Sequence, residues 1–160
     1  MAGDKRTLGY MDESREPLDI VRILVSDRNE LVTDFLAELI HGIARSGIKV
    51  ATIVPPTIRE ADLLETAVKQ TLDAAVLTLN NIFYSPYDAA TRAQTLAEDS
   101  LALVRKMVIL FKKPIIALYG SPDDLSYPSR IIEAGATAVF RLPFSSEEFQ
   151  QALKRCLSIW

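Results

Sequence analysis

The amino-acid sequence predicts an α/β fold, a doubly wound sheet of five parallel strands with helices on both faces. Two observations support this prediction. Short apolar runs rich in β-branched residues recur along the chain, as expected of strands that are covered on both faces. Segments with apolar residues at helical spacing separate these runs. Such an alternation is typical of a parallel sheet whose crossover connections contain helices.

The apolar runs and the periodic segments give the bounds of the predicted elements. The predicted strands are Val21–Ser26, Lys49–Val54, Ala74–Leu79, Pro114–Tyr119 and Thr137–Arg141. The predicted helices are Leu31–Ile43, Thr57–Gln70, Ala89–Phe111, Ser129–Ala134 and Ser145–Leu157. Each strand is followed by a helix, so the chain reads as a succession of strand–helix units.

The first unit has the clearest helical pattern. Leu31, Phe35, Leu39 and Ile43 recur at helical spacing and would form the apolar side of the first helix. Gly47 then ends the unit, because glycine readily adopts the backbone conformation that closes a helix.

The second and the last units carry start signals for their helices. Pro55 and Pro56 stop the second strand, and Thr57 with Glu60 three residues later predicts a capping box. Ser145 is a good N-cap for the last helix, and the acidic residues after it suit a helix start. In the fourth unit, Gly135 closes a short helix.

Right-handed crossovers and two covered faces favour the flavodoxin-like strand order 2-1-3-4-5. Residues 1–18 are polar without a sustained period and are predicted to form a flexible N-terminal arm, with one domain at residues 19–160. In such sheets a ligand or reactive site lies at the carboxyl ends of the strands. The candidate site residues at these ends are Asp27, Arg28, Thr78, Asn80, Tyr119 and Leu142.

Composition excludes several classes of function. The formal net charge of −3 argues against direct binding of nucleic acid by a broad basic surface. No apolar run approaches the roughly 20 residues that span a bilayer, so no membrane association is expected. The single cysteine, Cys156, cannot form an internal disulfide and fits a cytoplasmic location.

Several stretches of the sequence are similar to bacterial two-component receiver domains. The stretch from Glu133 through Arg141-Leu142-Pro143-Phe144 resembles the last strand and loop of that family. The segments 22–31, 73–80 and 113–120 resemble its first, third and fourth strands with the residues that follow them. The resemblance extends over most of residues 21–157 and implies the receiver fold and a role in signal transduction.

The same resemblance implies a phosphorylation site that this sequence does not preserve. The family uses two acidic residues for Mg²⁺, an aspartate nucleophile, a Ser or Thr, and a lysine. Only the first acid, Asp27, is present, and the other four positions hold Arg28, Thr78, Tyr119 and Leu142. A threonine hydroxyl needs a base to act as a nucleophile, and one carboxylate beside an arginine is a poor site for Mg²⁺. Tyr119 is expected to pack over this site as a lid.

The sequence therefore predicts a pseudo-receiver with no catalytic residue, no metal site and no cofactor. Its predicted function is that of a protein–protein interaction module in bacterial signalling or transcription control, independent of phosphorylation. Two alternatives remain at this stage. The altered pocket formed by Arg28, Thr78, Asn80 and Tyr119 could bind a small molecule as a sensor, or the chain could be an enzyme of another flavodoxin-like class.

An insertion around residues 82–98 supplies a candidate interaction surface. The stretch between Thr78 and Tyr119 is longer than in typical receivers. A cluster of aromatic residues falls in it, and the chain ends on another aromatic residue; these residues are Phe83, Tyr84, Tyr87 and Trp160. Aromatic residues are favoured as interface anchors, although a loop folded back on its own helix would use them equally well. By resemblance to receivers, a homodimer is also expected.

Overall fold

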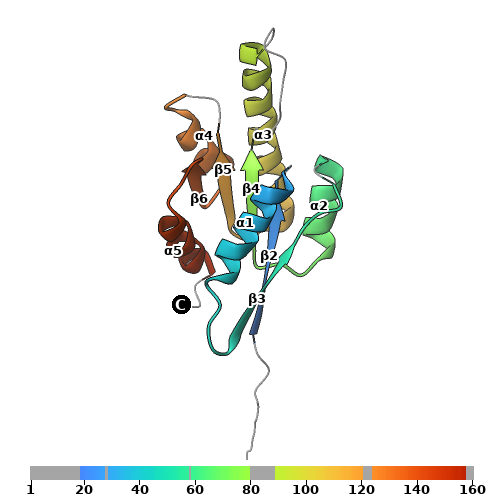
Figure 1. Ribbon diagram of the computed structural model, residues 1–160. Coiled ribbons are helices and arrows are strands. Elements are labelled where there is room, and N and C mark those ends of the chain that lie inside the picture. The colour runs from blue at the N-terminus through green and yellow to red at the C-terminus, as the bar shows by residue number, and fades with distance from the viewer. Residues whose placement is uncertain (1–18, 28, 58, 80–88, 121–123, 158–160) are drawn as a thin grey trace, which may run out of the picture.

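The computed structural model describes residues 19–27, 29–57, 59–79, 89–120 and 124–157. Its strands are β2 (Asp19–Ser26), β3 (Ile48–Ile53), β4 (Ala74–Leu79), β5 (Ile115–Tyr119) and β6 (Ala138–Arg141). Its helices are α1 (Glu30–His41), α2 (Glu60–Lys69), α3 (Ala89–Phe111), α4 (Tyr127–Ala134) and α5 (Ser146–Leu157). The strands and helices alternate as the sequence predicted (Figure 1).

The strand order confirms the predicted flavodoxin-like topology. The sheet has five strands in the order β3-β2-β4-β5-β6, and every neighbouring pair is parallel. β2 thus lies between β3 and β4. The strand order reverses beside β2, so the topological switch point lies at the end of this strand. The carboxyl ends of all five strands consequently meet at one edge of the sheet, which we call the carboxyl edge; the opposite one is the amino edge.

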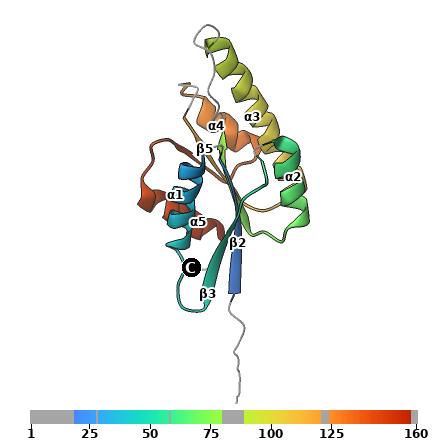
Figure 2. The ribbon, with the colours of Figure 1, turned by 45° about the vertical axis from the view of Figure 1, so that its right-hand side comes forward.

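Each face of the sheet has its own hydrophobic core, and Figure 2 shows α1 and α5 on one side of the sheet and α2 and α3 on the other. The core under α1 and α5 contains side chains that alternate along each strand, such as Ile23, Val76 and Leu118. The core under α2, α3 and α4 contains the intervening ones, such as Leu24, Leu77 and Ala117. This alternation explains the unbroken apolar runs in the sequence, since both faces of every central strand are buried.

The predicted capping box at the start of α2 is wrong. The helix begins at Glu60 with Arg59 as N-cap residue, and Arg59 makes no side-chain capping bond. The hydroxyl of Thr57 instead accepts a hydrogen bond from the Arg59 amide at 3.1 Å and donates one to Asp62. Thr57 thus forms a local turn of its own, the arrangement by which Ser and Thr compete with helix formation.

The predicted end of the first helix is also displaced, because α1 ends at His41 with Gly42, and not Gly47, as its C-cap residue. The helix ends predicted at Gly135 and Ser145 agree with the structure. Gly135 ends α4 with φ of 122°, in the region that favours glycine. The hydroxyl of Ser145 accepts a hydrogen bond from the Glu148 amide at 3.2 Å at the start of α5. Within the described residues, no helix is both long and apolar enough to cross a membrane.

Two predicted segments bear on the domain division. The flexible arm at residues 1–18 lies outside the described residues. The insertion around residues 82–98 is described from Ala89 onward, where it forms the first turns of α3. Figure 1 shows α3 extending beyond the ends of the strands that it covers.

Candidate functional site at the carboxyl edge of the sheet

Asp27 is a buried carboxylate at the entry to α1. It follows β2 directly and is only 8% exposed. One of its oxygens, Oδ1, accepts a hydrogen bond from the Asn29 amide at 2.8 Å. Asn29 in turn caps α1 by accepting a hydrogen bond from the Leu31 amide at 2.8 Å. Asp27 therefore has a structural role in shaping the turn between β2 and α1.

Thr78 and Tyr119 face opposite sides of the sheet, although both lie at its carboxyl edge. In the register of the parallel strands Thr78 is paired with Leu118, and Tyr119 is paired with Leu79. Because side chains alternate along a strand, Thr78 points toward the face covered by α1 and α5, whereas Tyr119 points toward the α2–α4 face. The two side chains therefore do not line one common pocket.

The expectation that Tyr119 forms a lid is wrong. Its side chain is 5% exposed and belongs to the core under α2, α3 and α4. The ring packs edge-on against the ring of Tyr127, with centroids 5.3 Å apart, and the Arg141 guanidinium carbon lies 6.0 Å from the Tyr119 centroid. Tyr119 is thus a packing residue that joins β5 to α4.

Leu142 lies in the loop between β6 and α5. Its amide donates a hydrogen bond to the Tyr119 carbonyl at 2.8 Å, and the peptide bond to Pro143 is cis. Phe144, which follows, packs against Phe149 with ring centroids 5.3 Å apart and reaches Phe35 of α1 at 6.5 Å. Leu142 itself is half-buried.

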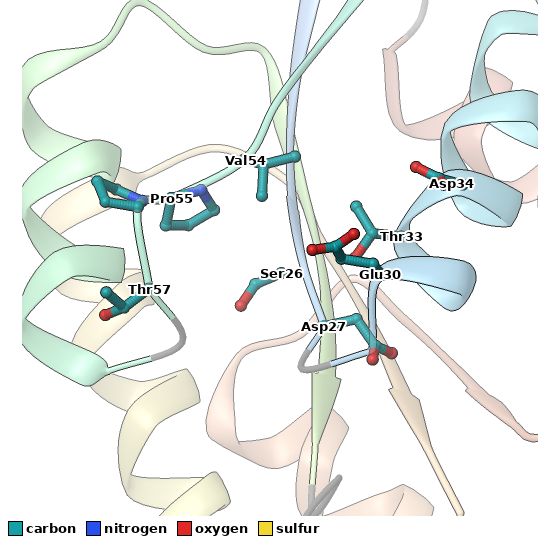
Figure 3. Close-up of a pocket in the computed structure, with 9 residues that line it drawn as sticks. Ser26, Asp27, Glu30, Thr33, Asp34, Val54, Pro55 and Thr57 are labelled. Carbon is teal, nitrogen blue, oxygen red and sulfur yellow. The ribbon is translucent and has the colours of Figure 1, made fainter.

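A cavity of about 390 Å³ opens beside Asp27, between the start of α1 and the segment after β3. Figure 3 shows the side chains that surround it. The lining residues are Ser26, Asp27, Glu30, Thr33, Asp34, Val54, Pro55, Pro56 and Thr57. The carboxylates lie on the side of α1, whereas Val54, the two prolines and Thr57 form the opposite side (Figure 3). Such a volume is within the range of small-molecule sites.

Comparison of the sequence with protein-family models and with curated protein sequences finds no match. Solved structures do resemble the chain. A CheY-like receiver domain from Methanospirillum hungatei matches with a TM-score of 0.63 and 16% identity, over 88% of this chain and 95% of that one. A response regulator from Thermotoga maritima matches with a TM-score of 0.62 and 16% identity, over 87% and 98% of the two chains. RcsB from Salmonella enterica serovar Typhimurium, solved with a promoter and a phosphomimetic, matches with a TM-score of 0.63 and 12% identity, over 84% and 67%.

The chain has the fold of a response-regulator receiver domain. The identities are low, so the shared property is the receiver fold, reached from a strongly divergent sequence. The strand order, the parallel sheet and the distribution of helices on its two faces agree with the expectation drawn from the sequence.

The described residues do not fit the Mg²⁺ site that the receiver fold implies. Mg²⁺ is usually held by one or two carboxylates with waters and phosphate oxygens in near-ideal octahedral geometry. Asp27 already uses one oxygen within its own turn. Among the described residues, no three His, Cys, Asp or Glu side chains are grouped so that they could hold a metal ion.

Thr78 is equally unsuited to the role of the receiver's nucleophile. Its hydroxyl oxygen is inaccessible to solvent and, among the described residues, has no hydrogen-bond partner. A base would have to remove its proton before it could attack a phosphoryl group. His41, the only histidine, lies at the last turn of α1, toward the amino edge of the sheet. Thr78 consequently has no base of that kind near it.

Asp73 lies far from this site. It precedes β4, and its carboxylate accepts a hydrogen bond from the Arg22 amide at 2.9 Å, while its own amide donates to the Arg22 carbonyl at 2.7 Å. These bonds place it at the amino edge of the receiver fold. A shifted alignment that made Asp73 the phosphoryl acceptor is therefore excluded.

Several candidate residues lie outside the described residues. These are Arg28, Asn80, Phe83, Tyr84, Tyr87 and Trp160. The structure thus brings Asp27, Thr78 and Leu142 to the carboxyl edge and places Tyr119 in the core.

Sequence reasoning missed the cavity beside Asp27. Three of the lining side chains, Glu30, Thr33 and Asp34, come from the first two turns of α1. These three residues have helical spacing at the start of a helix that begins at the carboxyl edge, and this pattern could have indicated a polar surface beside Asp27. The pair Pro55-Pro56 was interpreted only as the end of a strand, whereas it also forms a wall of the cavity.

Proposed function

We propose that this chain is a pseudo-receiver that acts as a protein–protein interaction module in bacterial signal transduction or transcription control. It works in the cytoplasm, without phosphorylation and not as an enzyme. The observation that carries the proposal is the buried hydroxyl of Thr78 at the end of β4, where a receiver requires a reactive aspartate. The similarity of the fold to RcsB, solved with a promoter, supports a context of transcription control.

Treatment with phosphoryl donors tests this proposal. The protein is incubated with Mg²⁺ and acetyl phosphate, and its intact mass is measured; a receiver with a complete phosphorylation site is treated in parallel. No mass increase is expected, because a neutral hydroxyl replaces an already ionised carboxylate. Beryllofluoride should likewise leave the amide NMR spectrum unchanged. A stable phosphoryl or beryllofluoride adduct would contradict the proposal.

We place the partner contacts of the module on the aromatic residues of the insertion and the C-terminus, Phe83, Tyr84, Tyr87 and Trp160. Loops held by a rigid scaffold carry binding residues more often than the scaffold itself. Truncating an aromatic anchor typically costs about 2 kcal/mol, which is roughly a thirtyfold loss of affinity. Tyr84→Ala and Tyr87→Ala should therefore weaken homodimer or partner association, as measured by analytical ultracentrifugation of the purified protein.

Thr78→Ala is the matched control for these aromatic variants, because it alters the old phosphorylation position and leaves the insertion intact. It should change association little. Circular dichroism then separates loss of binding from loss of folding. If the aromatic variants unfold the domain, or leave all association unchanged, the aromatic residues are packing residues and this surface is not the interface.

A small-molecule sensor is the second candidate function, and the cavity of about 390 Å³ beside Asp27 is the observation that favours it. The ligand would bind between α1 and the segment after β3, which line this cavity. Thr78 and Tyr119, which the sequence assigned to the ligand pocket, do not line it. A thermal-shift screen of metabolites tests this alternative. A stabilising ligand whose effect is abolished by Ser26→Trp, which fills the cavity, would support the sensor over the module.

A further inference from the structure

The last two turns of α3 and the residues just after them carry a local concentration of positive charge. Residues 105–113 contain four cationic side chains and no acidic one, although the formal net charge of the whole chain is −3. The four cations are all exposed; they are Arg105, Lys106, Lys112 and Lys113. Lys106 pairs with Glu60 of α2 at 2.6 Å, whereas no ion pair within the described part of the chain involves the other three. This end of α3 therefore presents positive charge to the solvent.

Two large apolar side chains lie among these cations. Ile109 is 68% exposed and Leu110 is 49% exposed. Ile109 follows Arg105 and Lys106 by one helical turn, so the three residues share the side of α3 that is turned away from the sheet. The opposite side of the helix is occupied by the core, because Met107 and its neighbours there are buried. The outer side of α3 thus combines an apolar centre with a cationic border.

The helix dipole explains the cations but not the apolar centre. Positive charges near the C-terminus of a helix are favourable, so Arg105 and Lys106 stabilise α3 by themselves. Ile109 gives no such benefit, because isoleucine has a lower helix propensity than lysine or arginine and its side chain here remains in water. Neighbouring exposed apolar residues mark interaction surfaces more often than single ones do. Covering Ile109 and Leu110 would supply the favourable free energy that burial of apolar surface gives.

We propose that the end of α3 binds an acidic amphipathic helix of a partner protein. Arg105 and Lys112 are seven residues apart, which is about 10 Å along a helix. Asp or Glu residues seven positions apart on the partner would match this separation. Apolar residues midway between them, one helical turn from each acid, would cover Ile109 and Leu110. Apolar contact would supply affinity, and charge complementarity would set the orientation of the two helices.

A membrane surface with anionic lipids fits this end of α3 less well. Helices that lie in a membrane interface insert their apolar face, whereas the apolar face of α3 is already buried against the sheet. The neighbouring helix α2 also presents the exposed carboxylates of Glu60 and Glu65, which anionic lipids would repel. Figure 2 shows α2 and α3 on the same side of the sheet. These observations favour a protein partner.

The inference rests on the proposed role as an interaction module, but it uses a separate surface. The aromatic residues of the insertion precede α3 in the chain, whereas Ile109 lies in the last turn of this helix. The 23 residues of α3 span about 35 Å. A partner bound at the end of α3 therefore leaves the beginning of the helix uncovered.

A designed peptide serves as the probe. It is a fluorescein-labelled helical peptide of Ala, Leu and Glu, with Glu residues seven positions apart and Leu residues midway between them. The control peptide has Lys in place of each Glu. Fluorescence anisotropy of the full chain with each peptide should show saturable binding of the acidic peptide only, and its affinity should fall as salt is added. Absence of saturable binding, or equal binding of the basic peptide, overturns the proposal.

Matched variants locate the binding surface. Ile109→Ser and Arg105→Glu should each weaken binding of the acidic peptide by about tenfold or more, and Ile109→Leu should retain it. Leu31→Ser on α1 and Lys49→Glu on β3 make the same kinds of change at exposed positions elsewhere and should leave binding unchanged. Circular dichroism checks that every variant is folded. If the control variants weaken binding equally, the attraction is non-specific and the proposal fails.

The same variants distinguish two other occupants. The protein should not co-sediment with vesicles of phosphatidylglycerol and phosphatidylcholine; co-sedimentation that is lost in Arg105→Glu would assign the surface to anionic lipids and contradict the proposal. Self-association of the protein alone that is lost in Ile109→Ser would assign it to a second copy of the chain, with the same consequence. The phosphoryl-donor experiment and the aromatic variants do not involve residues 105–113, so a failure here leaves the proposed function standing.

Discussion

The two edges of the sheet differ in how completely their polar groups are paired. At the amino edge, Asp73 and Arg22 exchange two hydrogen bonds, and Thr137 and Ile115 exchange two more. At the carboxyl edge, the buried Thr78 hydroxyl has no partner among the described residues, and a cavity opens beside Asp27. The amino edge thus resembles an optimised structural junction. The carboxyl edge is less completely paired and has an open cavity beside it.

Gly135→Ala should give the largest loss of stability, because it disturbs the amino edge where α4 meets β6. The φ of Gly135 is 122°, and an added Cβ would collide with the Val108 side chain. Backbone strain and overpacking together should lower the free energy of unfolding by about 3 kcal/mol. Urea denaturation measures the change.

Gly47→Ala is the matched control, because Gly47 has φ of 83° but no atom within 4 Å of the added Cβ. It should cost only the backbone strain, about 1 kcal/mol. Equal losses for the two variants would show that Val108 moves aside without cost.

Asp73→Ala should lower the free energy of unfolding by about 1–2 kcal/mol. The change leaves the part-buried Arg22 amide without the carboxylate that accepts its hydrogen bond at 2.9 Å. Asp73→Asn keeps an acceptor oxygen and should lose less than half as much. Urea denaturation measures the unfolding midpoints of both variants. Equal midpoints for Asp73→Ala and Asp73→Asn would contradict the structural role of the Asp73 carboxylate.

Thr78→Val should have little effect or raise stability by up to about 1 kcal/mol. Valine has nearly the same shape as threonine, and it removes a buried hydroxyl that has no partner among the described residues. Thr78→Ser, which keeps the hydroxyl and removes the methyl group, should destabilise the protein instead. A loss of more than about 1 kcal/mol in Thr78→Val would reveal a hydrogen bond to this hydroxyl.

The smallest expected effect concerns the reactivity of the Cys156 thiol in the unmodified sequence, and it involves no change in stability. Cys156 borders a small cavity at the amino edge, and burial raises the pKa of its thiol, partly opposed by the positive charge of Arg155. Because a raised pKa lowers the thiolate fraction at neutral pH, iodoacetamide should react more slowly with the folded protein than with the urea-unfolded chain. The folded protein's rate should still be rising at pH values where that of the unfolded chain has levelled off. Equal rates would show that Cys156 is freely accessible.

The architecture could be predicted from the sequence because its signals are local. The run from Ala74 to Leu79 and the helix from Ala89 to Phe111 have the predicted bounds. Gly135 and Ser145 end and begin their helices as expected. The predicted start of α2 was wrong because Thr57 forms a hydrogen-bonded local turn with Arg59. A capping box contains the same residue types as this turn, so the sequence alone could not distinguish the two.

The candidate site was less predictable because it depends on contacts between distant segments. Every residue of β5 is apolar and buried, so its pattern does not show which face Tyr119 occupies. The cavity depends on the position of α1 relative to Val54 and the prolines after β3. No periodicity in the sequence predicts the distance between these two segments. Asp27 was identified by resemblance, but its bond to the Asn29 amide became visible only in the structure.

The packing of Tyr119 against Tyr127 has a consequence for the number of conformations that the domain populates. Moving the Tyr119 ring to the surface would empty a filled part of the core, at a cost of about 3 kcal/mol. An equilibrium with that energy gap keeps the outward rotamer below roughly one molecule in a hundred. The domain therefore has one dominant resting state at this position, with the Tyr119 ring inside the core.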